Sequence, residues 1–207
     1  ILARTRDANS RINLAAIHMV QGEEEKAFEE LRKAAEDNPD SPNPPSILGE
    51  YLERKIWLDE AEQLYLKALR IDPKHAVSHF RIGRLHAAQD KTGQSESHLK
   101  EAIDLNPEAP EYLETLGNLY EKTGKTFDAI AMLERASVLQ PDRAEIFIRL
   151  GNLYKQKQFY ERAAMRYWAA LDIDERDPRA HRLLKELYEI LGQQTKDKLQ
   201  QLENQNT

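Results

Sequence analysis

The residues of this sequence that could carry acid–base or metal chemistry are of few types: six histidines and 36 aspartates and glutamates. There is no cysteine, which excludes thiolate catalysis, disulfides and cysteine-bound metals. The acidic residues gather in stretches such as EEEKAFEELRK and DERDPR, whose spacing is typical of ion pairs on solvated helix faces. The sequence contains neither a glycine-rich phosphate loop nor a nucleophile motif. We therefore predict that the chain is not an enzyme and takes no cofactor or metal.

Asparagine and arginine, in contrast, are suited to holding a peptide. An asparagine amide both donates and accepts hydrogen bonds, so it can pair with a peptide backbone. An arginine guanidinium can bind a carboxylate through two parallel hydrogen bonds. The pentapeptide LGNLY occurs twice, at residues 116–120 and 150–154, and places Asn118 and Asn152 at its third position. If other residues repeat at the interval between the two copies, that interval identifies the elements that position these side chains.

Four columns of small residues and prolines share that interval, a period of about 34 residues, which indicates a repeat architecture. The glycine column is Gly49, Gly83, Gly117 and Gly151. The proline column is Pro39, Pro73, Pro107 and Pro141. One alanine column is Ala34, Ala68, Ala102, Ala136 and Ala170, and the other is Ala27, Ala61, Ala129 and Ala163, with Ser95 in the gap. The predicted blocks are 8–41, 42–75, 76–109, 110–143 and 144–177, after a lead-in of residues 1–7 and before a partial sixth block, 178–207.

Each block has the apolar spacing of two helices joined by a short turn. In block 110–143, apolar residues from Leu113 to Tyr120 share one face, the turn follows at TGKT, and a second face runs from Ala129 to Ala136. Glycine and alanine allow the two helices to approach closely, and proline ends the second helix. Histidines also recur at the repeat interval: His79 aligns with His181, and His18 with His86. Histidines aligned in this way do not favour convergence on one metal ion.

This pattern resembles the tetratricopeptide repeat (TPR) family over residues 8 to about 192. The resemblance implies an all-α fold, a right-handed α-solenoid of helix-turn-helix hairpins with a C-terminal capping helix. TKDKLQQLENQNT, with Leu199 and Leu202 one helical turn apart, is expected to form that cap. The fifth block departs from the pattern, because Glu175 replaces its proline and Pro178 is expected to open the next helix.

The resemblance also implies that the first helix of each hairpin lines a groove. The residues at groove positions that we predict to bind a partner are Phe80, Arg81, Arg84, Asn118, Ile148, Arg149 and Asn152. The alternative is that these charges only solvate the surface. The clamp by which some TPR proteins hold acidic chaperone C-termini is rejected, because Thr115 and Glu145 stand where it requires asparagine and a base.

Two tryptophans fall outside this pattern. Trp168 occupies an outward column of the second helix, where it would anchor a partner as a second surface; the favoured alternative is packing under the C-terminal segment. Trp57 lies in the turn between two helices, where we expect it to plug the hairpin.

The predicted function is a non-catalytic adaptor that holds a segment of another protein, with acidic segments matching the arginines. A net charge of −6 is not that of a nucleic-acid-binding protein, and no apolar stretch is long enough for an integral membrane segment. The alternatives are a homo-oligomeric scaffold that assembles through its ends and the regulatory part of a longer enzyme. The chain begins at Ile1, which indicates a fragment or a processed form; a cytoplasmic location is favoured, and a periplasmic or peripheral membrane location follows if a targeting segment was removed.

Overall fold

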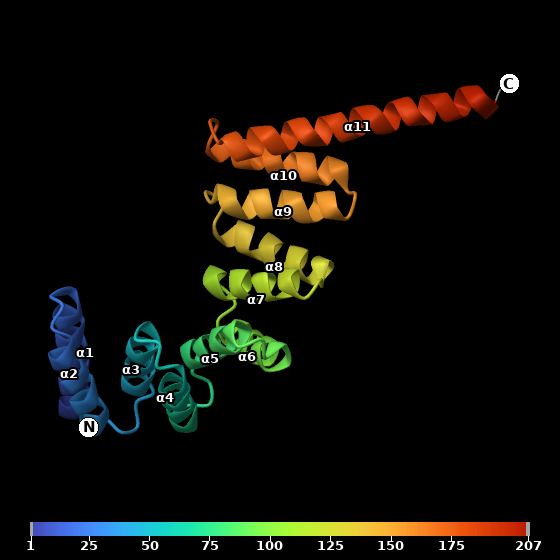
Figure 1. Cartoon of the computed structure of the whole chain (residues 1–207). Helices are drawn as coiled ribbons and strands as arrows, with labels where there is room; N and C mark the ends of the chain where they lie inside the picture. The colour runs from blue at the N-terminus through green and yellow to red at the C-terminus, as the bar shows by residue number, and fades with distance from the viewer. Residues whose placement is uncertain (1, 206–207) are drawn as a thin grey trace. The chain divides into compact units, whose positions relative to one another are not determined.

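The computed structural model describes the backbone of residues 2–205 and the side chains of residues 9–193. Within these residues the chain forms eleven helices and no strand, so the predicted all-α fold is confirmed (Figure 1). The helices are α1 (Leu2–Val20), α2 (Glu24–Asp37), α3 (Asn43–Arg54), α4 (Leu58–Ile71), α5 (Ala76–Ala88), α6 (Thr92–Leu105), α7 (Pro110–Lys122), α8 (Thr126–Leu139), α9 (Ala144–Gln156), α10 (Tyr160–Ile173) and α11 (Pro178–Gln205).

The helices follow one another as antiparallel hairpins that stack. The two helices of a hairpin contact each other, as α3 does α4 and α9 does α10. The second helix of a hairpin also contacts the first helix of the next, as α2 does α3, α4 does α5 and α8 does α9. The chain divides into two compact units, residues 1–112 and 113–207, and each unit is an α-solenoid segment of this kind.

The glycine column marks a close contact between the two helices in the four hairpins from α3 to α10, whereas α1 carries Ala15 at this position. The atoms nearest to each glycine of the column belong to a bulky side chain of the second helix, at the same offset along the chain in these four hairpins. The pairs are Gly49 with Tyr65, Gly83 with Leu99, Gly117 with Leu133, and Gly151 with Tyr167. A methyl group added at Gly49 would lie 2.7 Å from Cε1 of Tyr65, too close for any side chain to fit without displacing the ring.

Ser95 can take the place of alanine in this column because its hydroxyl group is hydrogen-bonded. The side chain is buried, and its Oγ donates a 2.7 Å hydrogen bond to the backbone oxygen of Gly83 on the facing helix. A buried hydroxyl that is hydrogen-bonded carries little penalty, so serine replaces alanine here without opening the hairpin.

Every hairpin turns through one residue with a positive φ, at the same place in each repeat. These residues are Gly22, Ile56, Asp90, Gly124 and Gln158, with φ between 58° and 75°. Glycine adopts this conformation freely, whereas β-branched Ile56 does so at a steric cost. The turn at Ile56 places Trp57 at the start of α4 with 58% of its surface exposed, so the prediction that Trp57 plugs the hairpin is wrong.

The two ends of the chain differ from the expected pattern in one respect. The predicted lead-in, residues 1–7, is helical from Leu2 onward, where helix α1 begins. Pro178 opens α11, as predicted. Ala180, Leu184 and Leu187 of α11 are buried, and α11 contacts α10. The side chains of Leu199 and Leu202 lie outside the described residues. None of the helices in the described part of the chain has the length and apolar composition that a membrane crossing requires.

We expect Gly49→Ala to lower the free energy of unfolding by about 1–3 kcal/mol, because the added methyl group overpacks the hairpin. Tyr65 cannot swing aside, since its ring is fully buried and its hydroxyl donates a 2.9 Å hydrogen bond to Glu53. Urea unfolding followed by circular dichroism measures the change. Gly93→Ala is the matched control in the same unit, because nothing lies within 4 Å of its added methyl group. Equal stability of the two variants would contradict the packing argument.

Candidate partner-binding face of the first helices

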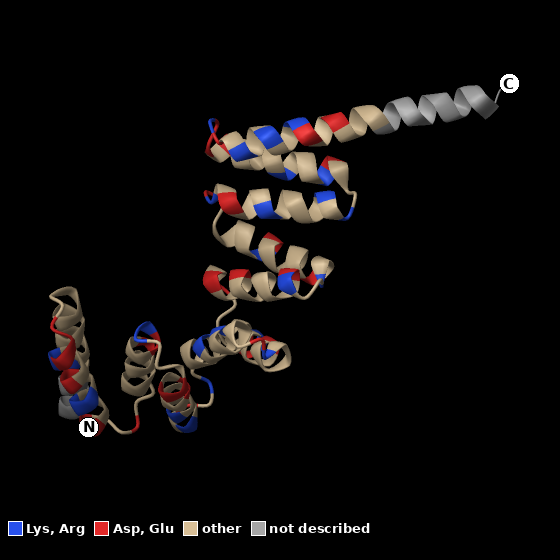
Figure 2. Cartoon of the chain, in the orientation of Figure 1, with Lys and Arg blue, Asp and Glu red and all other residues tan. Residues whose placement is uncertain are grey.

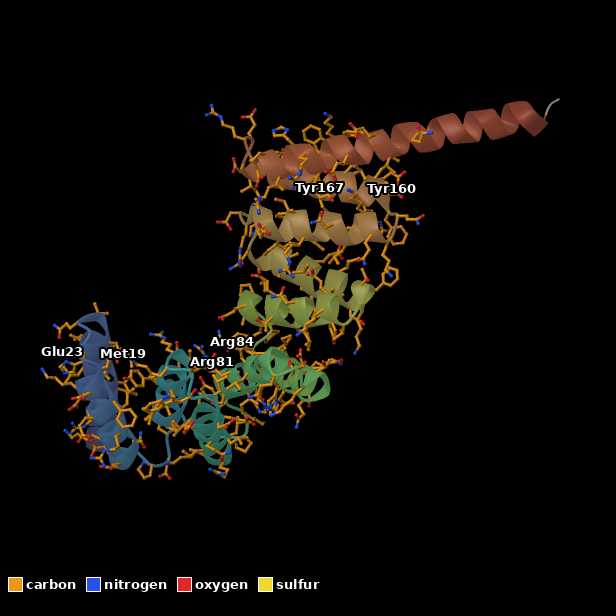
Figure 3. All side chains as sticks on the ribbon, in the orientation of Figure 1. Met19, Glu23, Arg81, Arg84, Tyr160 and Tyr167 are labelled. Carbon is orange, nitrogen blue, oxygen red and sulfur yellow. The ribbon has the colours of Figure 1, made fainter. Side chains whose placement is uncertain are left out.

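The predicted groove positions of the first unit lie on α3 and α5 and form a charged cluster. Arg81 Nη2 lies 2.9 Å from Oε2 of Glu50, and Arg84 pairs with Glu53. Arg54 also pairs with Glu50, at 2.9 Å. These five side chains line a surface hollow of about 300 Å³, and the labelled Arg81 and Arg84 project from α5 (Figure 3). The cluster holds three guanidinium groups against two carboxylates.

The groove positions of the second unit lie on α7, α9 and α11. Arg149 donates hydrogen bonds to Oδ1 of Asn118 and to the carboxylate of Glu121. Asn152 accepts a 2.8 Å hydrogen bond from the hydroxyl of Tyr167, and burial raises the pKa of that hydroxyl to about 12. Asn118 and Asn152 are both exposed, and among the described residues only the oxygens of their amides are engaged. Both NH₂ groups therefore remain available to a partner.

The prediction that Phe80 and Ile148 contact a partner at the surface is wrong, because both side chains are buried. Phe80 is 2% exposed and stacks on Tyr112, with 4.4 Å between ring centroids. Ile148 is 4% exposed. Both lie at the fifth position of their block, which packs against the neighbouring helices instead of facing outward. Burial of a large apolar side chain contributes about 1.5–3 kcal/mol, so packing is favoured over exposure.

The arginines carry intramolecular partners that the sequence prediction missed. Four pairs join residue i of one first helix to residue i+31 of the next: Glu50 to Arg81, Glu53 to Arg84, Asn118 to Arg149, and Lys155 to Glu186. The offset equals one repeat less about one helical turn, so the second residue lies about one turn nearer the start of its helix than the repeat equivalent of the first, within reach of a long side chain. This offset is present in the sequence and is the signal that would have identified the pairs. Basic and acidic segments are interspersed along the helices of each unit (Figure 2).

The structure assigns the seven predicted residues to two separate clusters. Phe80, Arg81 and Arg84 belong to the first unit. The second unit contains the others: Asn118, Ile148, Arg149 and Asn152. Within each unit the polar members gather on the first helices, whereas the two apolar members are internal.

Trp168 lies against the C-terminal helix, as the favoured alternative predicts, and about half of its surface stays exposed. Its indole Nε1 donates a 3.2 Å hydrogen bond to the hydroxyl of Tyr188 on α11, so it lies against the C-terminal helix. It is nevertheless 51% exposed and lines a surface hollow of about 390 Å³ beside Leu171 and His181.

Three histidines converge in the first unit, although their repeat columns did not indicate it. Nδ1 of His79 lies 3.0 Å from Nδ1 of His98, and the ring of His86 meets that of His98 edge-on. Nε2 of His86 lies 3.1 Å from a carboxylate oxygen of Glu62. Burial lowers the pKa of His98, and the neighbouring His79 and His86 lower it further. Among the described side chains, no group of three or more histidines and carboxylates is arranged to hold a metal ion.

Comparison with protein families gives matches to one kind of repeat. Two family models, both described as tetratricopeptide repeat, match residues 47–75 and residues 80–144. Stacked hairpins with a polar face on their first helices define a helical-repeat protein of the solenoid class. The chain therefore contains tetratricopeptide repeats in residues 47–75 and 80–144, and repeats of this kind support a protein-interaction scaffold.

Curated relatives match part of the chain. Human protein O-mannosyl-transferase TMTC2 is 31% identical over 98 residues, which cover 46% of this chain and 12% of that protein. Photosystem I assembly protein Ycf3 of Synechococcus sp. (strain CC9605) is 33% identical over 75 residues, which cover 30% of this chain and 43% of that protein. The chain thus spans less than half the length of either relative.

Solved structures match most of the chain at low identity. Pseudomonas aeruginosa PilF has a TM-score of 0.77 and 22% identity, with coverage of 93% of this chain and 88% of that chain. YrrB, described as a TPR protein with an unusual peptide-binding site, has a TM-score of 0.67 and 23% identity, with coverage of 86% and 92%. MamA has a TM-score of 0.68 and 20% identity, with coverage of 82% and 92%. At these identities the similarities show a shared fold and nothing more.

We expect Arg149→Glu to lower the free energy of unfolding by about 1–3 kcal/mol, because it removes charged hydrogen bonds and sets a carboxylate beside Glu114 and Glu121. Thermal unfolding followed by circular dichroism measures the loss. Arg135→Glu on α8 is the control: Arg135 is exposed, and we expect a change within about 0.5 kcal/mol. If both variants have the same melting temperature, the Arg149 pairs do not stabilise the fold.

The histidine cluster makes the stability of the first unit depend on pH. In the unfolded chain His98 has a pKa near 6.5, and in the folded chain its pKa is lower. As pH falls below about 6.5, the unfolded chain therefore binds a proton that the folded chain does not, and the free energy of unfolding decreases. Urea unfolding between pH 7.5 and pH 5.5 measures the slope, which His98→Asn should reduce. An unchanged slope in that variant would contradict the assignment.

Proposed function

We propose that the chain is a non-catalytic adaptor that holds a segment of a partner protein on the first-helix faces of its hairpins. The observation that carries this proposal is the charged hollow of the first unit, where Arg54, Arg81 and Arg84 outnumber Glu50 and Glu53. Arg54 has the most exposed side chain of the three. An acidic side chain or C-terminal carboxylate entering the hollow meets a guanidinium group at the surface and others already held in position.

The second unit offers a different kind of contact. The NH₂ groups of Asn118 and Asn152 project from α7 and α9 while their oxygens are held by Arg149 and Tyr167. An amide fixed in this way donates to a backbone carbonyl without further loss of side-chain freedom. This arrangement supports recognition of an extended backbone, irrespective of its side chains.

The relatives agree with this proposal in general terms. One is described as a peptide-binding TPR protein and another as an assembly protein for photosystem I. The partner of the present chain is proposed on chemistry alone: an extended segment that carries at least one carboxylate.

A self-associating scaffold is the second candidate, because helix α1 exposes Leu14, Ile17 and Val20 along one stretch. A row of exposed apolar residues on a helix favours contact with another protein surface. Light scattering separates the candidates, since a monomer at micromolar concentration counts against self-association. The partial match to a mannosyltransferase supports a third candidate, the interaction region of a longer enzyme, which the full-length gene decides.

We expect Arg54→Ala to reduce partner capture about tenfold, as loss of one charged hydrogen bond implies. Capture from extract of the source organism, quantified by mass spectrometry, compares this variant with wild type. Among the described residues Arg54 has one ion pair, to Glu50 on its own helix, so we expect the fold to be little affected.

Arg32→Ala is the matched control, because Arg32 is also exposed and paired on its own helix, but lies on α2. A partner depleted by Arg54→Ala and retained by Arg32→Ala supports the proposal. Equal retention by both variants, or the absence of any partner sensitive to Arg54, contradicts it.

A further inference from the structure

A second hollow, of about 430 Å³, lies in the first unit at the turn between α3 and α4. We call it the aromatic hollow; its lining residues are Glu24, Glu25, Phe28, Tyr51, Lys55 and Trp57. The rings come from three elements: Phe28 from α2, Tyr51 from α3, and Trp57 from the start of α4. The centroids of Phe28 and Tyr51 are 6.1 Å apart. The three rings thus border one open space.

The fold does not account for the exposure of Trp57. Its backbone is fixed, since its N–H donates a 3.0 Å hydrogen bond to the oxygen of Leu52 and its own oxygen accepts one from Ala61. Its side chain is nevertheless more than half exposed, and the preceding Ile56 is 79% exposed. Apolar surface of this size costs free energy in water and gains it when covered.

The chain's own lysine shows how a cation sits at this hollow. The Lys55 ammonium group forms an ion pair with Glu24 and lies 6.0 Å from the centroid of the Tyr51 ring. Ammonium and guanidinium groups are attracted to aromatic faces at this range. Lys55 therefore uses one carboxylate and one ring.

One carboxylate and two rings of the aromatic hollow take no part in holding Lys55. Glu25 is exposed and makes no hydrogen bond or ion pair within the described residues. Phe28 and Trp57 have no cation over their faces among the described side chains. With Glu24 and Glu25 against Lys55, the hollow carries a net charge of −1, which disfavours an acidic occupant.

We propose that the aromatic hollow binds a basic side chain, arginine or lysine, of a partner protein. The aliphatic stem of that side chain packs on Trp57 and Phe28, and its charge pairs with Glu25. This site is separate from the charged hollow on α3 and α5, and it selects the opposite charge. It does not depend on the function proposed above.

Trp57 itself reports binding, because the chain has two tryptophans and Trp168→Phe leaves only this one. The probe is the peptide acetyl-Gly-Arg-Gly-amide, titrated into the full chain carrying Trp168→Phe, with a lysine peptide as a second arm. We expect a saturable change in emission with a dissociation constant of about 1 mM, the range for one side chain in a shallow site. Glutamine and leucine peptides of the same form should bind at least tenfold more weakly.

Three variants distinguish binding at this site from non-specific binding elsewhere on the surface. Glu25→Gln should weaken binding about tenfold, whereas Glu29→Gln, on the same helix but outside the hollow, should leave it unchanged. Lys55→Gln should tighten binding several-fold, because it removes the internal competitor for Glu24. Circular dichroism checks that all variants fold.

The proposal is overturned by any of three results: no saturable change with either basic peptide, leucine or glutamine peptides binding as well as the basic ones, or Glu25→Gln binding like the parent. A change in Trp57 emission with protein concentration alone, without peptide, would identify a second copy of the chain as the occupant and would also overturn it.

Discussion

The close approach of a bulky side chain to a glycine on the facing helix is the constraint on which the rest of this structure depends. Tyr65 and Tyr167 occupy the space that a side chain at Gly49 or Gly151 would need. This contact fixes how far apart the two helices of a hairpin lie, and therefore where the second helix meets the next hairpin. Repeated in successive blocks of the sequence, it also determines which polar side chains of successive first helices stand opposite each other.

The period in the sequence was sufficient to predict the helical hairpins and the start of α11 at Pro178, because small residues and prolines act locally. It was not sufficient for side chains whose environment depends on a neighbouring repeat. Phe80 is buried by Tyr112, a residue of the next block, and Arg149 is held by Asn118 and Glu121 of the preceding one. Trp57 was also misplaced: it directly follows Ile56, the positive-φ residue of the turn, and its side chain stays 58% exposed instead of closing the hairpin.

Internal pairing changes what the charged faces can contribute to binding. A partner carboxylate that approaches Arg84 must share it with Glu53, so the exchange adds less free energy than contact with an unpaired arginine would. The pairs instead hold the guanidinium groups in one arrangement before a partner arrives, which favours selectivity over affinity. Net gain in affinity then depends on the groups that are least engaged, such as Arg54 and the NH₂ groups of Asn118 and Asn152.

The residue at the positive-φ turn position is not always the one that stabilises the fold best. Two hairpins use glycine there, which holds the turn without steric cost, whereas one uses Ile56. An L-residue in this conformation costs about 1–2 kcal/mol, and with most of its surface in water Ile56 recovers little of this through packing. Ile56 and Trp57 form an exposed apolar tip, and Trp57 borders the hollow that Glu24 and Glu25 also line, on a hairpin whose core is otherwise closed by Tyr65 over Gly49. Fold stability explains the closed core and does not explain the tip, so the tip is better understood as surface that another molecule covers.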